Sequence, residues 1–131
     1  MRSLVRETVF KFIYSRLFNN NDEGLFDALI SKLDQKDKDF AKDLLKAYED
    51  TIEKNSEVLR NLSKSFSYDR IYNVDRTLIL LGMAELDCFI NTPTLVIIDE
   101  YVKLSAVFST DNSVNFVNAI LANYSKERKD V

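Results

Sequence analysis

The stretch from Leu78 to Ala84, LILLGMA, is apolar on every side of a helix and constrains the fold more than any other part of the chain. A helix that is apolar all round must be covered on all sides by other elements. Gly82 lies within the stretch and lets another helix approach closely. Glu85 follows directly, and a buried carboxylate there requires a partner, which we expect to be a basic side chain or a neighbouring helix end. The sequence thus predicts a central helix that begins at Val74.

Hydrophobic periodicity predicts further helices on both sides of the central one. The segment 40–62 is one long helix or two helices that share a direction, and residues 63–72 form a connector with one short helical turn. Pro93 is expected at the first position of its helix, behind Thr92 as N-cap, and Asp111 or Asn112 is expected to cap the last helix. Besides the central helix, the expected helices span residues 3–18, 23–33, 40–62, 93–108 and 113–125.

The helix expected over residues 93–108 is also largely apolar. Leu95, Ile98 and Val102 belong to an apolar surface that covers most of its circumference. Asp99, Glu100 and Lys103 form the remaining polar strip.

Residues that break helices are nearly absent from this sequence, which has 2 glycines and 1 proline in 131 residues. No internal repeat, low-complexity segment or change in composition indicates a boundary between domains. The expected architecture is therefore all-α, with about six to seven helices in one domain over residues 1–131.

The charge distribution is uneven. The whole chain has a net charge of −3 and a pI near 5.0, which argues against nucleic-acid binding by bulk charge alone. Residues 1–18 carry an excess of three positive charges, because Arg2, Arg6, Lys11 and Arg16 are opposed only by Glu7. Any anion-binding surface is expected to start at this end of the chain.

Residue types needed for common catalytic and cofactor sites are missing. The chain has no histidine, which removes the commonest general base and metal ligand. Its 2 glycines cannot build a phosphate-binding loop, and Cys88 is the single cysteine, so no thiol metal cluster or internal disulfide forms. We expect no enzyme activity, no cofactor and no metal, and a cytoplasmic location, since neither a secretory signal nor a membrane span is apparent.

Several motifs in fixed order resemble a known family. They are RETVFKFIYS at 6–15, FAKDLL at 40–45, VDRTLILLGMAEL at 74–86, Thr92-Pro93 followed by VIIDEYVKLSAVF at 96–108, and NFVNAIL at 115–121. Together they resemble the NusB family of bacterial transcription antitermination factors, in which an apolar helix ends in Glu-Leu, a Pro-led helix carries Ile-Asn-Glu, and Phe-Val-Asn-Gly follows. The chain departs from this pattern at three positions. It has Leu80 where the family usually has Arg, Asp99 where Asn is usual, and Ala119 where Gly is usual. The family's Arg-rich leader is reduced to Arg2 and Arg6.

The resemblance implies a NusB-like fold of two packed three-helix bundles and an RNA-binding function in antitermination. Its implied partners are single-stranded boxA-like RNA, the small ribosomal protein NusE and the RNA polymerase antitermination complex, without a cofactor or a membrane. By position it implies RNA contacts at Arg2, Arg6, Tyr14, Asn115 and Phe116, and contacts to the protein partner at Asp75 and Arg76. Cationic side chains hold RNA phosphates and aromatic faces stack on bases, so four of these residues have suitable chemistry.

Other interpretations remain open from the sequence. Arg2 and Arg6 also fit a solvated basic turn without a ligand, and Phe116 also fits a place in the core beside Ile120. The low overall charge predicts weak RNA binding by the chain alone, so a partner that adds positive surface is expected. The alternative function is a helical protein-interaction or self-associating regulatory module with no RNA role, for which a homodimer is possible.

Overall fold

The computed structural model describes residues 2–19, 24–63 and 68–129, and in these ranges the only regular secondary structure is helical. This confirms the prediction of an all-α protein. The elements are α1 (Arg2–Ser15), α2 (Leu25–Ile30), α3 (Gln35–Leu62), the short 3₁₀ helix η1 (Tyr68–Arg70), α4 (Asn73–Cys88), α5 (Thr94–Phe108) and α6 (Asp111–Lys129).

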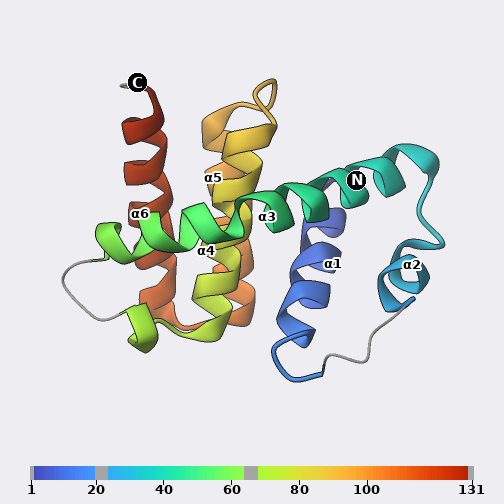
Figure 1. Cartoon of the computed structure of the whole chain (residues 1–131), viewed down its shortest axis with the longest axis horizontal. Coiled ribbons are helices and arrows are strands. Elements are labelled where there is room, and N and C mark those ends of the chain that lie inside the picture. The colour runs from blue at the N-terminus through green and yellow to red at the C-terminus, as the bar shows by residue number, and fades with distance from the viewer. Residues whose placement is uncertain (1, 20–23, 64–67, 130–131) are drawn as a thin grey trace.

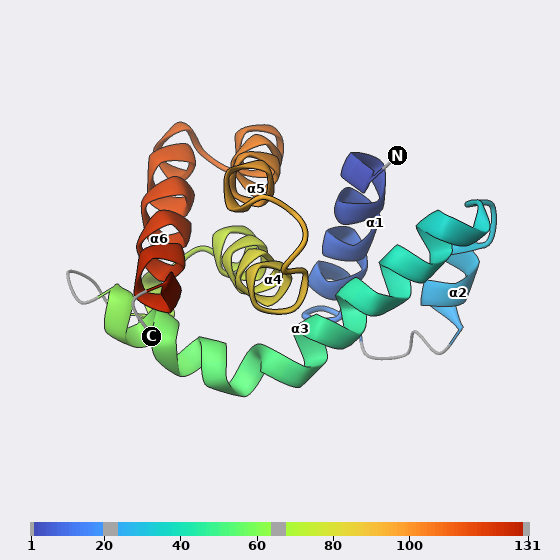
Figure 2. The ribbon, with the colours of Figure 1, turned by 90° about the horizontal axis from the view of Figure 1, so that it is seen from above.

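The helices form two groups that α3 joins. Figure 1 shows α1, α2 and the first half of α3 on one side and α4, α5 and α6 on the other. Seen from above, α3 runs along one side of the whole molecule, while α4 lies between α1 and the α5–α6 pair (Figure 2). Helix α4 contacts α1, α3, α5 and α6. The expected pair of three-helix groups is therefore present, with α4 at their junction.

The central position of α4 follows from its sequence. Every residue from Thr77 to Leu86 is buried, which confirms that this helix is covered on all sides. Leu80, which replaces the family's usual Arg, is 4% exposed and belongs to the core. A Cβ added at Gly82 would lie 3.1 Å from both methyl carbons of Leu121 and 3.3 Å from Cδ2 of Tyr101. Gly82 therefore permits the close approach of α5 and α6, as predicted.

Several helix boundaries differ from those expected. Helix α3 is one continuous helix that begins at Gln35, because the Asp34 side chain caps it by accepting the Asp37 backbone N–H at 2.9 Å. Pro93 is the N-cap of α5 and not its first residue, so the expected Thr92 cap is wrong by one position. Helix α6 begins at Asp111, and the hydroxyl of Thr110 accepts the Ser113 backbone N–H at 3.2 Å in place of the expected Asp111 or Asn112 cap.

A buried ion pair connects α1 to α4. The Arg6 guanidinium donates from Nε to Oε1 of Glu85 at 2.9 Å, and these side chains are 3% and 0% exposed. From α5, the Tyr101 hydroxyl donates to the same Oε1 at 2.7 Å. Burial and the Glu85 carboxylate raise the pKa of Tyr101 well above its usual value, so the phenol stays protonated and remains a donor. The prediction that Glu85 has a basic partner is confirmed.

The same ion pair corrects the expectation for Arg6. This residue was expected to share a solvent-facing basic turn with Arg2, but its guanidinium lies inside the protein. Burying Glu85 without a partner would be costly, and Arg6 is the cation that offsets this cost. Arg6 therefore holds α1 against α4 and is not accessible to RNA in this structure.

Glu85→Gln tests the importance of this ion pair. The amide has nearly the same shape, but the substitution leaves the buried Arg6 with only the more distant carboxylate of Glu100, 3.9 Å away, as a negative partner. We expect the free energy of unfolding in urea to fall by about 3–5 kcal/mol. Asp50→Asn is the matched control, because it breaks an exposed i,i+4 pair with Lys46 and is expected to cost less than about 0.5 kcal/mol. Equal effects of the two substitutions would contradict a central role for the Arg6–Glu85 pair.

Candidate nucleic-acid interface

Two adjoining pockets flank the start of α4, one towards η1 and α6 and the other towards the ends of α1 and α5. The first has a volume of about 280 Å³ and the second about 430 Å³, and Tyr72 and Thr110 line both. Because they share these residues, the pockets form one continuous surface, which we call the Tyr72 surface. Its lining residues are Tyr14, Arg70, Ile71, Tyr72, Asn73, Val74, Asp75, Phe108, Ser109, Thr110, Asn112, Ser113 and Phe116.

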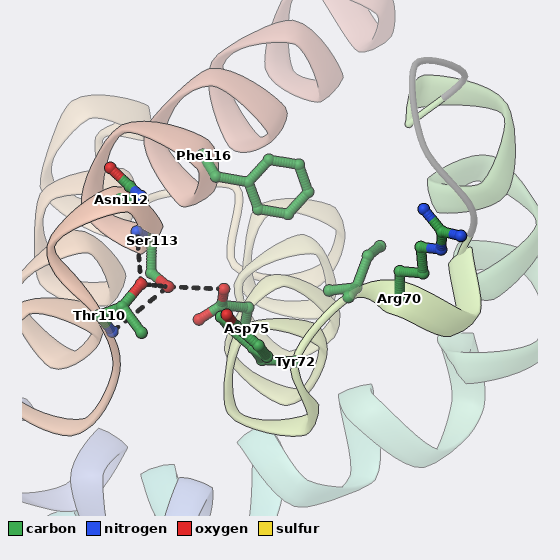
Figure 3. Close-up of a pocket in the computed structure, with 8 residues that line it drawn as sticks. Arg70, Tyr72, Asp75, Thr110, Asn112, Ser113 and Phe116 are labelled. Carbon is green, nitrogen blue, oxygen red and sulfur yellow. Dashed lines mark hydrogen bonds between the residues drawn. The ribbon is translucent and has the colours of Figure 1, made fainter.

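The first pocket combines aromatic, cationic and amide side chains. Figure 3 shows Phe116 and Arg70 on different sides of the pocket, with Asp75 below the Phe116 ring on the side of Ser113. Phe116 is half-buried and packs against the core while its ring also lines the pocket. Asn112 lies on the α6 side (Figure 3). Phe116 therefore combines the two roles that the sequence left open, packing and surface contact.

The carboxylate of Asp75 is held by hydroxyl groups. Ser109 donates to Oδ1 at 2.6 Å, and Ser113 donates to Oδ2 at 2.7 Å. Asp75 is only 4% exposed. The prediction that its side chain contacts a protein partner is therefore corrected: the carboxylate joins the start of α4 to the α5–α6 turn and fixes the base of the pocket.

The second pocket places two aromatic residues beside Tyr72. Tyr14 comes from the last turn of α1 and Phe108 from the end of α5. The Tyr14 ring lies 5.3 Å from the ring of Phe18, which is 68% exposed. The ammonium group of Lys11 lies 5.2 Å from the Phe108 ring centroid. Aromatic side chains thus continue from α6 across to the end of α1.

Arg76 shapes the turn before α4. Its guanidinium donates to the backbone carbonyl of Ile71 at 3.1 Å and to Oδ1 of Asn73 at 2.9 Å. Its Cζ also lies 4.8 Å from the Tyr68 ring centroid. Arg76 is half-buried, so part of its side chain remains accessible next to the Tyr72 surface.

The residues expected to face RNA do not form one cluster. Tyr14 and Phe116 line the Tyr72 surface, and the exposed Asn115 lies next to it on α6. Arg2 lies at the other end of α1, about 18 Å from Tyr14 along the helix axis. It is exposed, and its Cζ lies 4.4 Å from the Phe40 ring centroid. The structure therefore brings Tyr14 and Phe116 together in one surface. It places Asn115 outside the two pockets, separates Arg2 and buries Arg6.

Sequence reasoning missed Arg70 and Tyr72 in this surface. Both lie in or next to the short connector before α4, where no periodic pattern indicates which side chains face outward. Tyr72 is 60% exposed, which is unusual for an aromatic side chain of this size. An aromatic residue two positions before the predicted helix start was the one available signal.

The Tyr72 surface has both positive and negative groups at its rim. The N-termini of α4 and α6 both border it, and helix N-termini carry partial positive charge. Asp75 and Asp111 lie in the first turns of these helices and offset part of this charge. Arg70 is exposed and adds a full positive charge beside the aromatic residues. The surface thus has local positive groups although the whole chain is acidic.

Two further structural features bear on function. Within residues 2–19, 24–63 and 68–129, no group of three or more Cys, Asp or Glu side chains is placed to hold a metal ion. In the same ranges, no helix has both the length and the apolar composition needed to cross a membrane.

The fold and this surface define an all-α protein of two helical groups with an aromatic, partly cationic face, and comparison with known proteins identifies the family. The NusB family model matches residues 3–126. The transcription antitermination protein NusB of Methylacidiphilum infernorum is 33% identical, with 96% of this chain and 91% of the relative covered. The chain belongs to the NusB family.

Solved structures support the same assignment. The structure of T. maritima NusB superposes with a TM-score of 0.89 at 26% identity, covering 97% of this chain and 92% of that one. A structure of the antitermination factors NusB and NusE in complex with double-stranded RNA matches with a TM-score of 0.80. It covers 96% of each chain at 24% identity, a level at which the likeness concerns the fold alone.

Asp75→Ala tests whether this residue is structural. Removing the carboxylate takes away the acceptor of both Ser109 and Ser113 and leaves these hydroxyls only each other and Thr110 as partners, in a place where Ser113 is 2% exposed. We expect the free energy of unfolding to fall by about 1.5–3 kcal/mol, measured by urea denaturation. Asp50→Ala on α3 is the control and is expected to change it by less than about 0.5 kcal/mol. If the Asp75→Ala variant is as stable as the unmodified chain, the structural role is contradicted, and the contact to a protein partner remains the better explanation for Asp75.

Proposed function

We propose that this chain is a transcription antitermination factor that binds boxA-type single-stranded RNA together with the small ribosomal protein NusE. Membership of the NusB family supports the proposal, as does the similarity to transcription antitermination proteins of other bacteria. The structural observation that carries it is the Tyr72 surface, where accessible aromatic rings lie beside Arg70 and two helix N-termini.

The chemistry of this surface suits single-stranded RNA. Unpaired bases stack on aromatic side chains, and their edges are recognised by amide groups. Tyr72 and Phe116 offer rings, while Asn112 and Asn115 offer amides next to them. Arg70 is placed to contact a phosphate. We propose these residues as the centre of the RNA contact.

Arg2 and Arg6 have separate roles in this proposal. Arg2 supplies a second positive group at the far end of α1, where it can contact a more distant phosphate. Arg6 acts indirectly, because its guanidinium is engaged with Glu85 inside the protein. It stabilises the position of α1, which carries both Arg2 and Tyr14.

A protein partner is part of the proposed function. The net charge of −3 and the few cations on the Tyr72 surface favour weak RNA binding by the chain alone. A ribosomal protein adds positive charge and so raises the affinity of the complex. We propose Arg76 as a partner contact, since it is half-buried beside the surface, and assign Asp75 to the support of the same turn.

The proposed role is one of binding and not of catalysis. The absence of histidine in the chain and the polar but unreactive groups of the Tyr72 surface support this assignment. If the protein binds nascent RNA in a complex with RNA polymerase, as we propose, it acts in the cytoplasm.

Tyr72→Ala tests the RNA contact directly. The substitution removes an exposed ring, and one stacked base contributes about 1–3 kcal/mol. We therefore expect affinity for a boxA-type oligoribonucleotide, measured by fluorescence anisotropy with NusE present, to fall about 5- to 150-fold. Tyr72→Phe keeps the ring and is expected to bind like the unmodified chain.

A charge-matched pair of variants provides the control for this measurement. Arg70→Gln removes a cation from the Tyr72 surface, and Lys46→Gln removes one from α3, where Lys46 is 74% exposed. We expect Arg70→Gln to reduce the salt dependence by roughly 0.7 in log–log slope, the value of one phosphate contact with a single strand. Lys46→Gln leaves the slope unchanged. Wild-type binding by both Tyr72→Ala and Arg70→Gln would exclude this surface as the RNA site.

A further inference from the structure

A cluster of cations lies next to the Tyr72 surface, where η1 meets the end of α3. The Tyr68 ring in η1 contacts two guanidinium groups: the Cζ atom of Arg60 lies 4.5 Å from its centroid and that of Arg76 lies 4.8 Å from it. Arg60 comes from the last turn of α3 and Arg76 from the start of α4. The two Cζ atoms are no more than about 9.3 Å apart, the sum of these distances. We call Arg60, Tyr68 and Arg76 the Tyr68 cluster.

The Tyr68 cluster is continuous with the Tyr72 surface. Arg70 lines the first pocket from the η1 side (Figure 3). Tyr68 and Arg70 are two residues apart in η1, a rise of roughly 4 Å along a 3₁₀ helix. The guanidinium of Arg76 donates to the backbone carbonyl of Ile71, which lines the same pocket. A strand of RNA that leaves the pocket past Arg70 therefore meets Tyr68 first and Arg60 next.

Arg60 keeps hydrogen-bond donors for a ligand. An arginine has five N–H groups, and among the described residues only Glu57 accepts from Arg60, at Nη1 over 3.0 Å. The two side chains are 51% and 69% exposed, and an ion pair between exposed side chains adds little stability. A phosphate can therefore replace the Glu57 carboxylate at low cost. Because Arg60 already lies against the Tyr68 ring, its guanidinium also loses less freedom when a phosphate binds.

The positive charge in this part of the surface is only partly offset. Arg76 donates to a backbone carbonyl and to an amide oxygen, which are both uncharged. Glu57 pairs with Arg60, and Asp69 is an exposed carboxylate in η1. Together with Arg70, three guanidinium groups thus accompany two exposed carboxylates along η1, the last two turns of α3 and the start of α4. An excess of positive charge therefore continues from the Tyr72 surface to α3.

We propose that RNA flanking the boxA-type segment continues from the Tyr72 surface over η1 to the end of α3, where Arg60 binds one of its phosphates. Tyr68 is a positioning residue that holds the Arg60 guanidinium, and Arg76 supports Tyr68 from α4. The inference rests on the proposed RNA contact at the Tyr72 surface, because the segment bound there brings its flanking nucleotides to Arg60. Such tethering gives a high effective concentration, so a single exposed cation contributes measurably to affinity.

Oligoribonucleotides of two lengths separate this subsite from the main contact. One contains only the boxA-type segment, and the other carries the same segment with a short uridine tail, at the 5′ end in one version and at the 3′ end in a second. Affinity is measured by fluorescence anisotropy with NusE present, over a range of salt concentrations. We expect one tailed version to bind more tightly than the untailed RNA, with a log–log salt slope steeper by roughly 0.7, the value of one further phosphate contact.

Arg60→Gln should remove this gain. Affinity for the tailed RNA should fall about 2- to 5-fold at low salt, and its salt slope should return to that of the untailed RNA. Binding of the untailed RNA should not change. Arg60→Lys keeps the positive charge and should retain most of the added slope. Tyr68→Leu should lose part of the gain, whereas Tyr68→Phe, which keeps a ring beside the guanidinium, should preserve it.

The exposed Lys46–Asp50 pair on α3 provides the matched control. Lys46→Gln breaks this i,i+4 pair, just as Arg60→Gln breaks the exposed i,i+3 pair with Glu57, and should leave binding of the tailed RNA unchanged. Glu57→Gln removes the carboxylate that competes with phosphate for Arg60, so it should tighten binding of the tailed RNA. Asp50→Asn should not tighten it. Circular dichroism checks that every variant is folded.

A failure of this inference can be told apart from a failure of the proposed function. If Tyr72→Ala weakens binding of both RNAs but Arg60→Gln changes neither, or changes both equally, the Arg60 subsite is wrong and the Tyr72 contact stands. The subsite is also overturned if neither tail tightens binding to the unmodified chain. If Arg60→Gln lowers only the affinity for NusE, the Tyr68 cluster is a protein contact instead. If Tyr72→Ala changes neither RNA, the proposed RNA contact is wrong, and the subsite cannot be its continuation.

Discussion

The carboxylate of Glu85, buried in the middle of α4, is the constraint on which much of the structure depends. An isolated negative charge at that depth is strongly unfavourable, so the fold must deliver a cation and a hydroxyl to it. Arg6 arrives from α1 and Tyr101 from α5. One side chain thus fixes α1 and α5 relative to the central helix, while apolar packing around Leu78–Leu86 supplies the bulk of the stabilisation. This arrangement holds the end of α1 beside the start of α4, where Tyr14 joins the Tyr72 surface.

The Tyr72 surface is built by a second polar constraint at the other end of α4. The Asp75 carboxylate accepts hydrogen bonds from Ser109 and Ser113 and so ties the start of α4 to the α5–α6 turn. Two helix N-termini and the half-buried Phe116 are brought together as a result. The polar groups at this site serve the architecture, whereas the accessible rings and Arg70 provide the binding chemistry. The residues that hold these helix ends in place are thus different from the residues that we propose to contact RNA, although both groups lie in the same few turns.

The sequence predicted the fold well because it depends on periodic apolar residues, and the site poorly because exposure depends on tertiary contacts. The apolar run in α4 and the need of Glu85 for a partner were both evident. The identity of that partner, Arg6, could not be predicted. Arg6 and Glu85 are far apart in sequence, and only the packing of α1 on α4 brings them together. For the same reason Asp75 resembled a surface charge. Tyr72 lies in a connector without periodicity, and Leu95 is exposed because no helix among the described residues covers the outer side of α5.

Mapping of backbone amide chemical shifts by NMR, as a boxA-type oligoribonucleotide is added with NusE present, tests the proposed RNA site most directly. If RNA binds at the Tyr72 surface, the largest RNA-dependent changes, measured against the complex without RNA, will occur at Arg70, Tyr72 and Phe116 and at neighbouring residues. Amides around Lys46 and Asp50 on α3 will change little. Large changes confined to α3, or no changes at the junction of η1, α4 and α6, would contradict the proposed site.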